Sequence, residues 1–206
     1  MEHLKIVASA RQVPSRLVTN DELSTMMETN DDWIYTRTGI RQRQVVTTEN
    51  TSDLAIQVAE QLLAKAQVSA ESLDFIVVST MSPDSLSPST AAIVQGAIGA
   101  NQAFAFDLSA ACSGLVYGMS VASSLLSTRY RRGLVIGAEV LSKLVDWQDR
   151  TTAVLFGDGA AGVLVETTEE AIGLLSEELR TFGDKGDNLV AGRFGNANPF
   201  SGDITP

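Results

Sequence analysis

The chain has 206 residues, 44% of them hydrophobic and 19% charged, so it can bury a sizeable core. A net charge of −10 opposes extended contact with nucleic acid or an anionic membrane. A single cysteine excludes an internal disulfide, and a single histidine argues against a zinc site. Apolar runs end well short of the ~20 residues of a bilayer crossing, and the first residues lack a signal peptide's apolar core, so we expect a cytoplasmic protein.

The N-terminal third predicts a strand, a short helix and a long amphipathic helix. Residues 4–8 are an apolar β-branched run, and residues 20–22 supply cap residues for a short helix. A longer helix is expected from Thr51, which Thr51 or Ser52 can cap. Its apolar face is predicted to hold Leu54, Val58, Leu62 and Ala66.

The middle of the chain alternates buried strands with helices. Residues 75–80 read FIVVST, an unalternating run typical of a central strand covered on both faces. A helix opens at residues 87–89 and closes at Gly99, and a second strand follows at 103–108. The next helix is expected over residues 113–127. Its predicted buried stripe is Leu115, Met119, Ala122 and Leu126.

The last predicted elements are three strands and a polar tail. Residues 134–138 form a buried strand, and residues 152–156 and 161–166 read as an antiparallel pair joined by a Gly-Asp-Gly turn. Repeated β-α-β units with a terminal hairpin predict a layered α/β domain. The tail from Gly183 is rich in Gly, Asn and Asp, and the chain looks interrupted rather than completed.

Cys112 lies where the strand at 103–108 turns into an apolar helix. Unpaired N–H groups at a helix start favour the thiolate, and the small neighbours Ala111 and Gly114 leave room for an acyl group. A lone cysteine is also often a small buried hydrophobe. These residues alone leave both interpretations open.

Three blocks of sequence together resemble one family. They are residues 32–41 (DWIYTRTGIR), 107–115 (DLSAACSGL) and 156–161 (FGDGAA). In order and spacing they are similar to the β-ketoacyl-acyl carrier protein synthase III family, whose members are acyltransferases of the thiolase superfamily. The resemblance implies the first βαβαβαββ half of a duplicated five-layer α-β-α-β-α sandwich. Residues 1–172 would form that N-terminal half, and residues 173–206 would begin the connection to a C-terminal half.

The resemblance also implies a chemistry. Cys112 would take an acyl group from acetyl-CoA or another short acyl-CoA, and malonyl-acyl carrier protein would then decarboxylate and condense with the thioester. Trp33 would stack on the CoA adenine, with Arg150 on its other face. Arg37 would meet a CoA phosphate, and Thr29 would hydrogen-bond near the base. Acyl-CoA is a substrate here, so no cofactor is expected, and the family is homodimeric.

The chain departs from the family at several positions. The family's catalytic His and Asn, which come from the second half, are absent, and His3 cannot replace them. Ser87 stands where many members place a Phe that floors the acyl pocket, and Met81 stands where a smaller residue is common. Leu141 is a further pocket candidate. Taken alone, Trp33 could be a buried anchor, Arg150 a solvated charge, and Asp158 is expected to be structural.

Two other functions fit the same residues. One is a thiolase-superfamily acyltransferase of secondary metabolism, which shares the cysteine and the Trp-Arg features. The other is a non-catalytic fragment that binds CoA or dimerises. A local basic cluster of Arg37, Arg41 and Arg43 could also bind a small anion in any of these cases.

Overall fold

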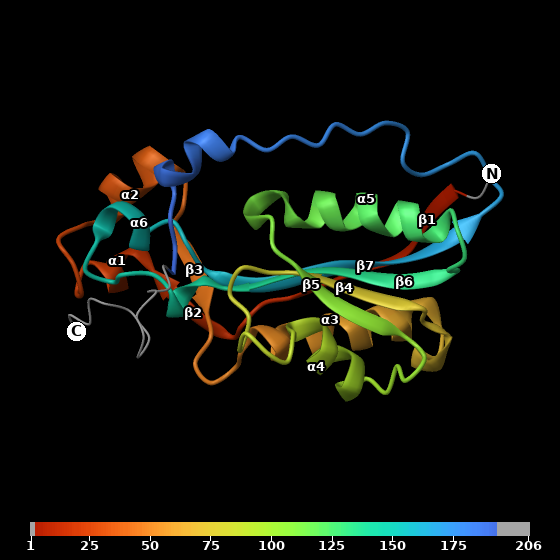
Figure 1. Ribbon diagram of the computed structural model, residues 1–206. Helices are drawn as coiled ribbons and strands as arrows, with labels where there is room; N and C mark the ends of the chain where they lie inside the picture. Colours follow the sequence, from red (N-terminus) through yellow and green to blue (C-terminus); the bar gives the residue numbers. More distant parts are fainter. Residues whose placement is uncertain (1–2, 193–206) are drawn as a thin grey trace, which may run out of the picture.

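The computed structural model describes residues 3–192 and is built around one mixed β-sheet (Figure 1). The sheet has five strands in the order β1-β7-β6-β4-β5. The central strand β4 is parallel to β5 and β6, whereas β7 is antiparallel to β6 and to β1. The strands are β1 (His3–Gln12), β4 (Phe75–Ser79), β5 (Phe104–Leu108), β6 (Arg132–Val140) and β7 (Asp158–Thr168).

Helices cover both faces of this sheet. Helices α3 (Thr51–Ala66) and α4 (Thr90–Ala97) lie on one face and α5 (Gly114–Leu126) on the other (Figure 1). Every residue of β4 is buried, and its side chains alternate between the two faces. Ile76 and Val78 join the core under α3 and α4, while Phe75 and Val77 join the core under α5. The predicted central strand and layered α/β fold are therefore confirmed.

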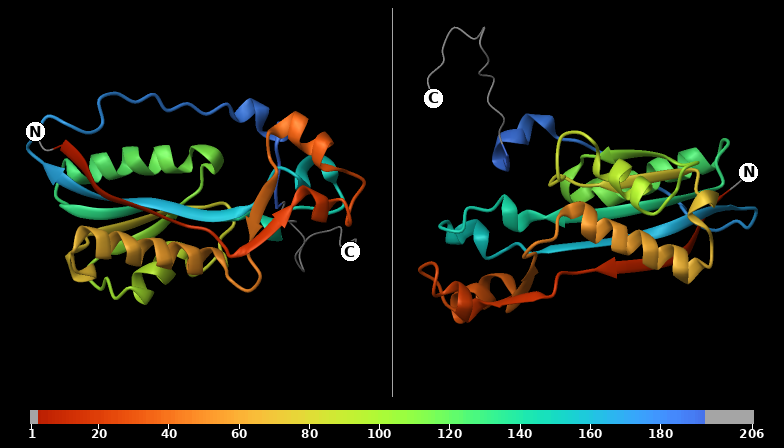
Figure 2. Two further views of the ribbon diagram at one scale, coloured as in Figure 1. Left: turned by 180° about the vertical axis from the view of Figure 1, so that it is seen from behind. Right: turned by 90° about the horizontal axis from the view of Figure 1, so that it is seen from below.

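A smaller unit lies at the end of the sheet where the parallel strands finish (Figures 1 and 2). Its apolar cluster contains Val18, Leu23, Ile34 and Val154, with Trp33 and Trp147 packed against it. The sequence predicted only the short helix of this unit. Its elements are β2 (Arg16–Thr19), α1 (Asn20–Leu23), α2 (Asp31–Thr38), β3 (Gln42–Val45) and α6 (Arg150–Ala153).

The predicted terminal hairpin is wrong. Residues 150–153 form α6, because the Asp149 side chain accepts from the backbone N–H of Thr151 and caps a helical turn. The Gly-Asp-Gly segment does not join two strands, since Asp158 opens β7, which pairs with β6 and β1. The carboxylate of Asp158 accepts from Val46 N and from the N–H and hydroxyl of Ser142, which agrees with the expected structural role.

The predicted stripe of α5 is also partly wrong. Leu115 is 40% exposed, and the face toward the sheet is formed by Gly114, Gly118, Ala122 and Leu126. A Cβ on Gly118 would lie 2.9 Å from Val135 Cγ1. The glycines therefore let the helix approach the sheet more closely than a leucine stripe would allow.

The start of α3 is fixed by Asn50, whose N–H donates to Asp53, rather than by Thr51 or Ser52. The described part of the tail contains one 3-10 turn at Gly183–Asn188, and residues 193–206 lie outside the described residues. Within residues 3–192, no helix has the length and hydropathy that a membrane crossing requires.

Candidate functional site

Cys112 is exposed at the junction between β5 and α5. It lies in a 3-10 turn (Ala111–Ser113) that runs directly into α5, and the preceding Ala111 has a φ of +44°. A non-glycine residue in this left-handed region costs free energy, and such positions cluster at functional sites. A Cβ on Gly114 would meet Ser79 Cβ at 2.9 Å. The turn is thus set tightly on the end of β4, and the thiol faces solvent.

Two of the acyl-pocket candidates, Met81 and Leu141, lie near the carboxylate of Glu139, a residue that the sequence analysis did not select. Glu139, near the end of β6, accepts from the backbone N–H of Met81 at 2.9 Å and from the hydroxyl of Ser82. The Ser82 hydroxyl also accepts from Val140 N at 2.8 Å, next to Leu141. The sequence signal that could have identified Glu139 is a charged residue inside the otherwise apolar run LVIGAEV, because a buried charge needs hydrogen-bond partners.

The remaining pocket candidate stands apart. Ser87 is exposed on the loop before α4, beside Leu86, which is 82% exposed. The hydrogen bonds of Glu139 and Ser82 therefore join Met81 to Val140, the residue before Leu141, and Ser87 lies outside this network.

The candidate CoA residues meet at Trp33 in α2. The guanidinium carbon of Arg37 lies 4.6 Å from the ring centroid, and that of Arg150 lies 4.9 Å from it. Arg37 also donates to Trp33 O at 3.2 Å, and Arg150 donates to Glu28 O at 2.6 Å. Two cations over one half-buried indole form a polar and π-rich surface that suits a planar base beside phosphate groups.

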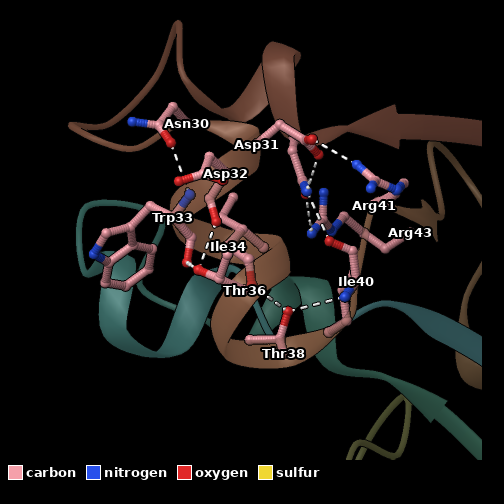
Figure 3. A network of polar contacts seen from close by, with 11 residues as sticks. Asn30, Asp31, Asp32, Trp33, Ile34, Thr36, Thr38, Ile40, Arg41 and Arg43 are labelled. Atoms are coloured by element: carbon pink, nitrogen blue, oxygen red, sulfur yellow. Dashed lines mark hydrogen bonds and ion pairs between the residues drawn. The ribbon is translucent and has the colours of Figure 1, made fainter.

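Neighbouring residues hold this pair of helices in place. The side chain of Asn30 accepts from Trp33 N at 2.8 Å and caps α2, which Gly39 ends with a φ of +73° (Figure 3). Asp149 caps α6, and hydrogen bonds from Thr151 lower the pKa of its carboxyl group. The Thr29 hydroxyl oxygen is buried and has no hydrogen-bond partner among the described residues.

Topology places the thiol and the Trp33 cluster at the same end of the sheet. Cys112 follows the carboxyl end of β5, and α2 and α6 lie beyond that end (Figures 1 and 2). His3 opens β1 opposite Thr168, at the amino ends of the parallel strands. It therefore lies far from the thiol, as expected. No group of three or more potential metal-ligating side chains occurs among residues 3–192.

The mixed sheet with helices on both faces is that of one half of the thiolase-like fold, and it carries an exposed cysteine at a strand-to-helix turn. Residues 106–183 match the family model of 3-oxoacyl-[acyl-carrier-protein] synthase III. The chain is 53% identical over 202 residues to β-ketoacyl-[acyl-carrier-protein] synthase III from Lactococcus lactis, covering 98% of this chain and 62% of that protein. It is thus related along nearly its whole length to β-ketoacyl-[acyl-carrier-protein] synthase III, and the predicted resemblance is confirmed.

Solved structures agree with this relationship. The synthase III from Thermus thermophilus superposes with a TM-score of 0.88 at 40% identity, over 94% of this chain and 61% of that one. A priming β-ketosynthase of the R1128 polyketide pathway superposes with a TM-score of 0.79 at 32% identity, over 82% of this chain and 51% of that one. The chain spans about three fifths of the length of the curated relatives it matches.

Proposed function

We propose that the chain is the acyl-accepting part of an initiating condensing enzyme of fatty acid synthesis, acting in the cytoplasm as a homodimer. The observation that carries this proposal is the exposed Cys112 on a strained turn, at the same end of the sheet as the Trp33 cluster. Residues 1–172 would be the N-terminal half, and residues 173–206 would lead to a C-terminal half.

The proposed reaction has two steps. The thiolate of Cys112 attacks the thioester carbonyl of acetyl-CoA, the carbon–sulfur bond of the substrate breaks, and CoA leaves as a thiolate that takes up the proton that Cys112 released. Malonyl-acyl carrier protein then loses CO₂, and the resulting carbanion attacks the acyl-cysteine and releases the thiolate. The described residues provide the nucleophile and the base-stacking surface. The family's His and Asn, which would assist decarboxylation, are absent from this sequence.

Trp33, Arg37, Thr29 and Arg150 would hold the CoA moiety. Stacking on the indole and charge on the guanidinium groups would fix the nucleotide, so that the thioester reaches Cys112 in a reactive geometry. Met81, Ser87 and Leu141 would border the acyl chain. Because the Ser82–Glu139 network links the backbone of Met81 to that of Val140, next to Leu141, this part of the pocket would resist widening for longer acyl chains.

The proposal is tested by incubating the protein with acetyl-CoA and measuring its intact mass. We expect one acetyl group, removable by hydroxylamine as a thioester, and none in Cys112→Ala. Because Cys112 is the single cysteine of the chain, no other thiol can account for the adduct. An unmodified protein would overturn the proposal and favour the non-catalytic alternative that binds CoA or dimerises without turnover.

A secondary-metabolism acyltransferase is the second candidate, and the likeness to the R1128 priming ketosynthase favours it. Both candidates share the cysteine and the Trp33 cluster, so acylation of Cys112 does not distinguish them. The acceptor of the acyl group distinguishes them. Turnover of acyl-Cys112 protein with malonyl-acyl carrier protein of fatty acid synthesis supports the first candidate, and turnover only with a polyketide carrier protein or a small-molecule acceptor supports the second.

A further inference from the structure

Arg43 in β3 is a buried cation that pairs with no carboxylate among residues 3–192. The residue is 7% exposed. Its guanidinium donates to Val18 O at 3.3 Å, to Asn20 Oδ1 at 2.9 Å and to Val154 O at 3.1 Å. Burial lowers the pKa of this group, and its Nε has no hydrogen-bond partner among the described residues. Arg43 is therefore buried, unlike Arg37 and Arg41, the other two residues of the basic cluster in the sequence.

The acceptors of Arg43 connect the two helices that form the Trp33 cluster. Val154 ends α6, the helix that begins with Arg150. Asn20 also contacts α2, because its Nδ2 donates to Asp31 Oδ1 at 2.8 Å. Asp31 lies in the first turn of that helix (Figure 3). One guanidinium thus links the helix that carries Trp33 with the helix that carries Arg150.

A purely structural joint at this place would not need a charge. Replacing a buried charge by an apolar side chain of similar volume is often neutral or stabilising, and Arg43 borders the apolar cluster that includes Val18 and Val154. The chain instead has a glycine, Gly157, beside the Arg43 side chain. A Cβ on Gly157 would lie 3.0 Å from both Arg43 Cβ and Gln44 O, so the segment leaving α6 packs directly on β3. What the guanidinium adds is a rigid fork that fixes several acceptors at once.

We propose that Arg43 is a positioning residue that sets the separation of Trp33 and Arg150 and thereby the affinity for acyl-CoA. This inference rests on the proposed function of the Trp33 cluster. Arg43 acts through α2 and α6, since it is buried. Without its fork, α6 is free to shift relative to α2, and the Arg150 guanidinium loses its place over the indole.

The test compares Arg43→Met with the control Arg16→Met in the full-length protein. Arg16 is an exposed arginine on the neighbouring strand β2 and pairs with Glu22. For Arg43→Met we expect KM for acetyl-CoA to rise about tenfold while kcat stays within about twofold, because a lost binding contact remote from the chemistry affects ground and transition states alike. Arg16→Met should leave both constants unchanged. An unchanged KM in Arg43→Met, or a fall in kcat at constant KM, overturns the proposal.

A double-mutant cycle separates positioning from general damage. If Arg43 works through Arg150, adding Arg150→Ala to Arg43→Met raises KM little further, whereas independent effects multiply and would overturn the proposal. Should Arg43→Met fail to fold, Arg43→Lys replaces it, since lysine keeps the charge and stem but lacks the fork. A raised KM with a retained melting temperature then supports the proposal, and a parental KM refutes it.

Trp33 emission tests the geometry without using activity. The 206-residue chain with Trp147→Phe has Trp33 as its sole tryptophan and is used for this measurement. Arg43→Met should change the Trp33 emission in the same direction as Arg150→Ala does, because both take the Arg150 guanidinium away from the ring, while Arg37 stays in place. Parental emission in Arg43→Met overturns positioning. A parent that binds no acetyl-CoA instead overturns the proposed function, so the two failures are distinguishable.

Discussion

The residue before the thiol carries the strain at this site. Ala111 has a φ of +44°, a conformation that costs an alanine about 1–2 kcal/mol relative to the right-handed region. The sequence predicted the strand-to-helix junction around Cys112 from hydrophobic patterning and small neighbours. It could not predict the strain, because nothing in the pattern of an Ala-Ala-Cys run distinguishes a left-handed alanine from a helical one.

At the same scale, the contacts of Trp33 predict coupled losses of affinity. Replacing Trp33 or Arg150 by Ala should each weaken acetyl-CoA binding by about 1–2 kcal/mol, and the double variant should lose less than the sum because both act on one ring. Isothermal titration calorimetry measures this. Arg129→Ala is the matched control, since Arg129 lies over Tyr130 at 5.4 Å outside the site. If both single variants bind as tightly as the parent, the assignment of the Trp33 cluster to CoA is wrong.

At the scale of elements, hydrophobic runs located the buried strands and the helices α3 and α4 well. They failed where other forces decide. Helix α6 has four residues and depends on the Asp149 cap, which competes with the β-branched content of the same segment. The predicted stripe of α5 was right at Ala122 and Leu126 and wrong at Leu115, which faces outward, while Gly114 and Gly118 face the sheet. Close packing, which single-chain periodicity does not reveal, made that choice.

This packing predicts opposite effects for two helical glycines. Gly118→Ala should lower the free energy of unfolding by about 1–3 kcal/mol, because the new methyl group would press on Val135 and on the Ser79 hydroxyl. Gly96→Ala in α4 meets nothing within 4 Å and should raise it by about 0.5–1 kcal/mol. Urea denaturation of both variants measures the difference. A Gly118→Ala protein as stable as the parent would show that α5 does not pack on the sheet at this distance.

For the molecule as a whole, the order of strands and helices predicted a layered α/β half, and the structure agrees. Apart from one short helix, the unit around Trp33 was recognised only through the resemblance, because its short polar helices and small apolar cluster lack a strong periodic signal. The exposed outer face of α5 is the other feature that patterning could not supply. Outward apolar residues of α5 resemble core residues in the sequence and differ from them only in what lies opposite.

The outer face of α5 predicts how the 206-residue chain behaves by itself. Val116 is 59% exposed, Leu115 is 40% exposed, and Leu175, on the segment that crosses over α5, is 91% exposed (Figure 1). Apolar side chains gathered on one face drive association, since burying them removes apolar area from water. We expect this chain alone to self-associate at micromolar concentration, as measured by size-exclusion chromatography with light scattering. Val116→Lys should shift it toward the monomer, and Glu60→Lys, at an exposed position on α3 across the sheet, should not. A monodisperse monomer with a cooperative thermal unfolding transition would contradict this prediction, because it would show that the outer face of α5 is stable in contact with water.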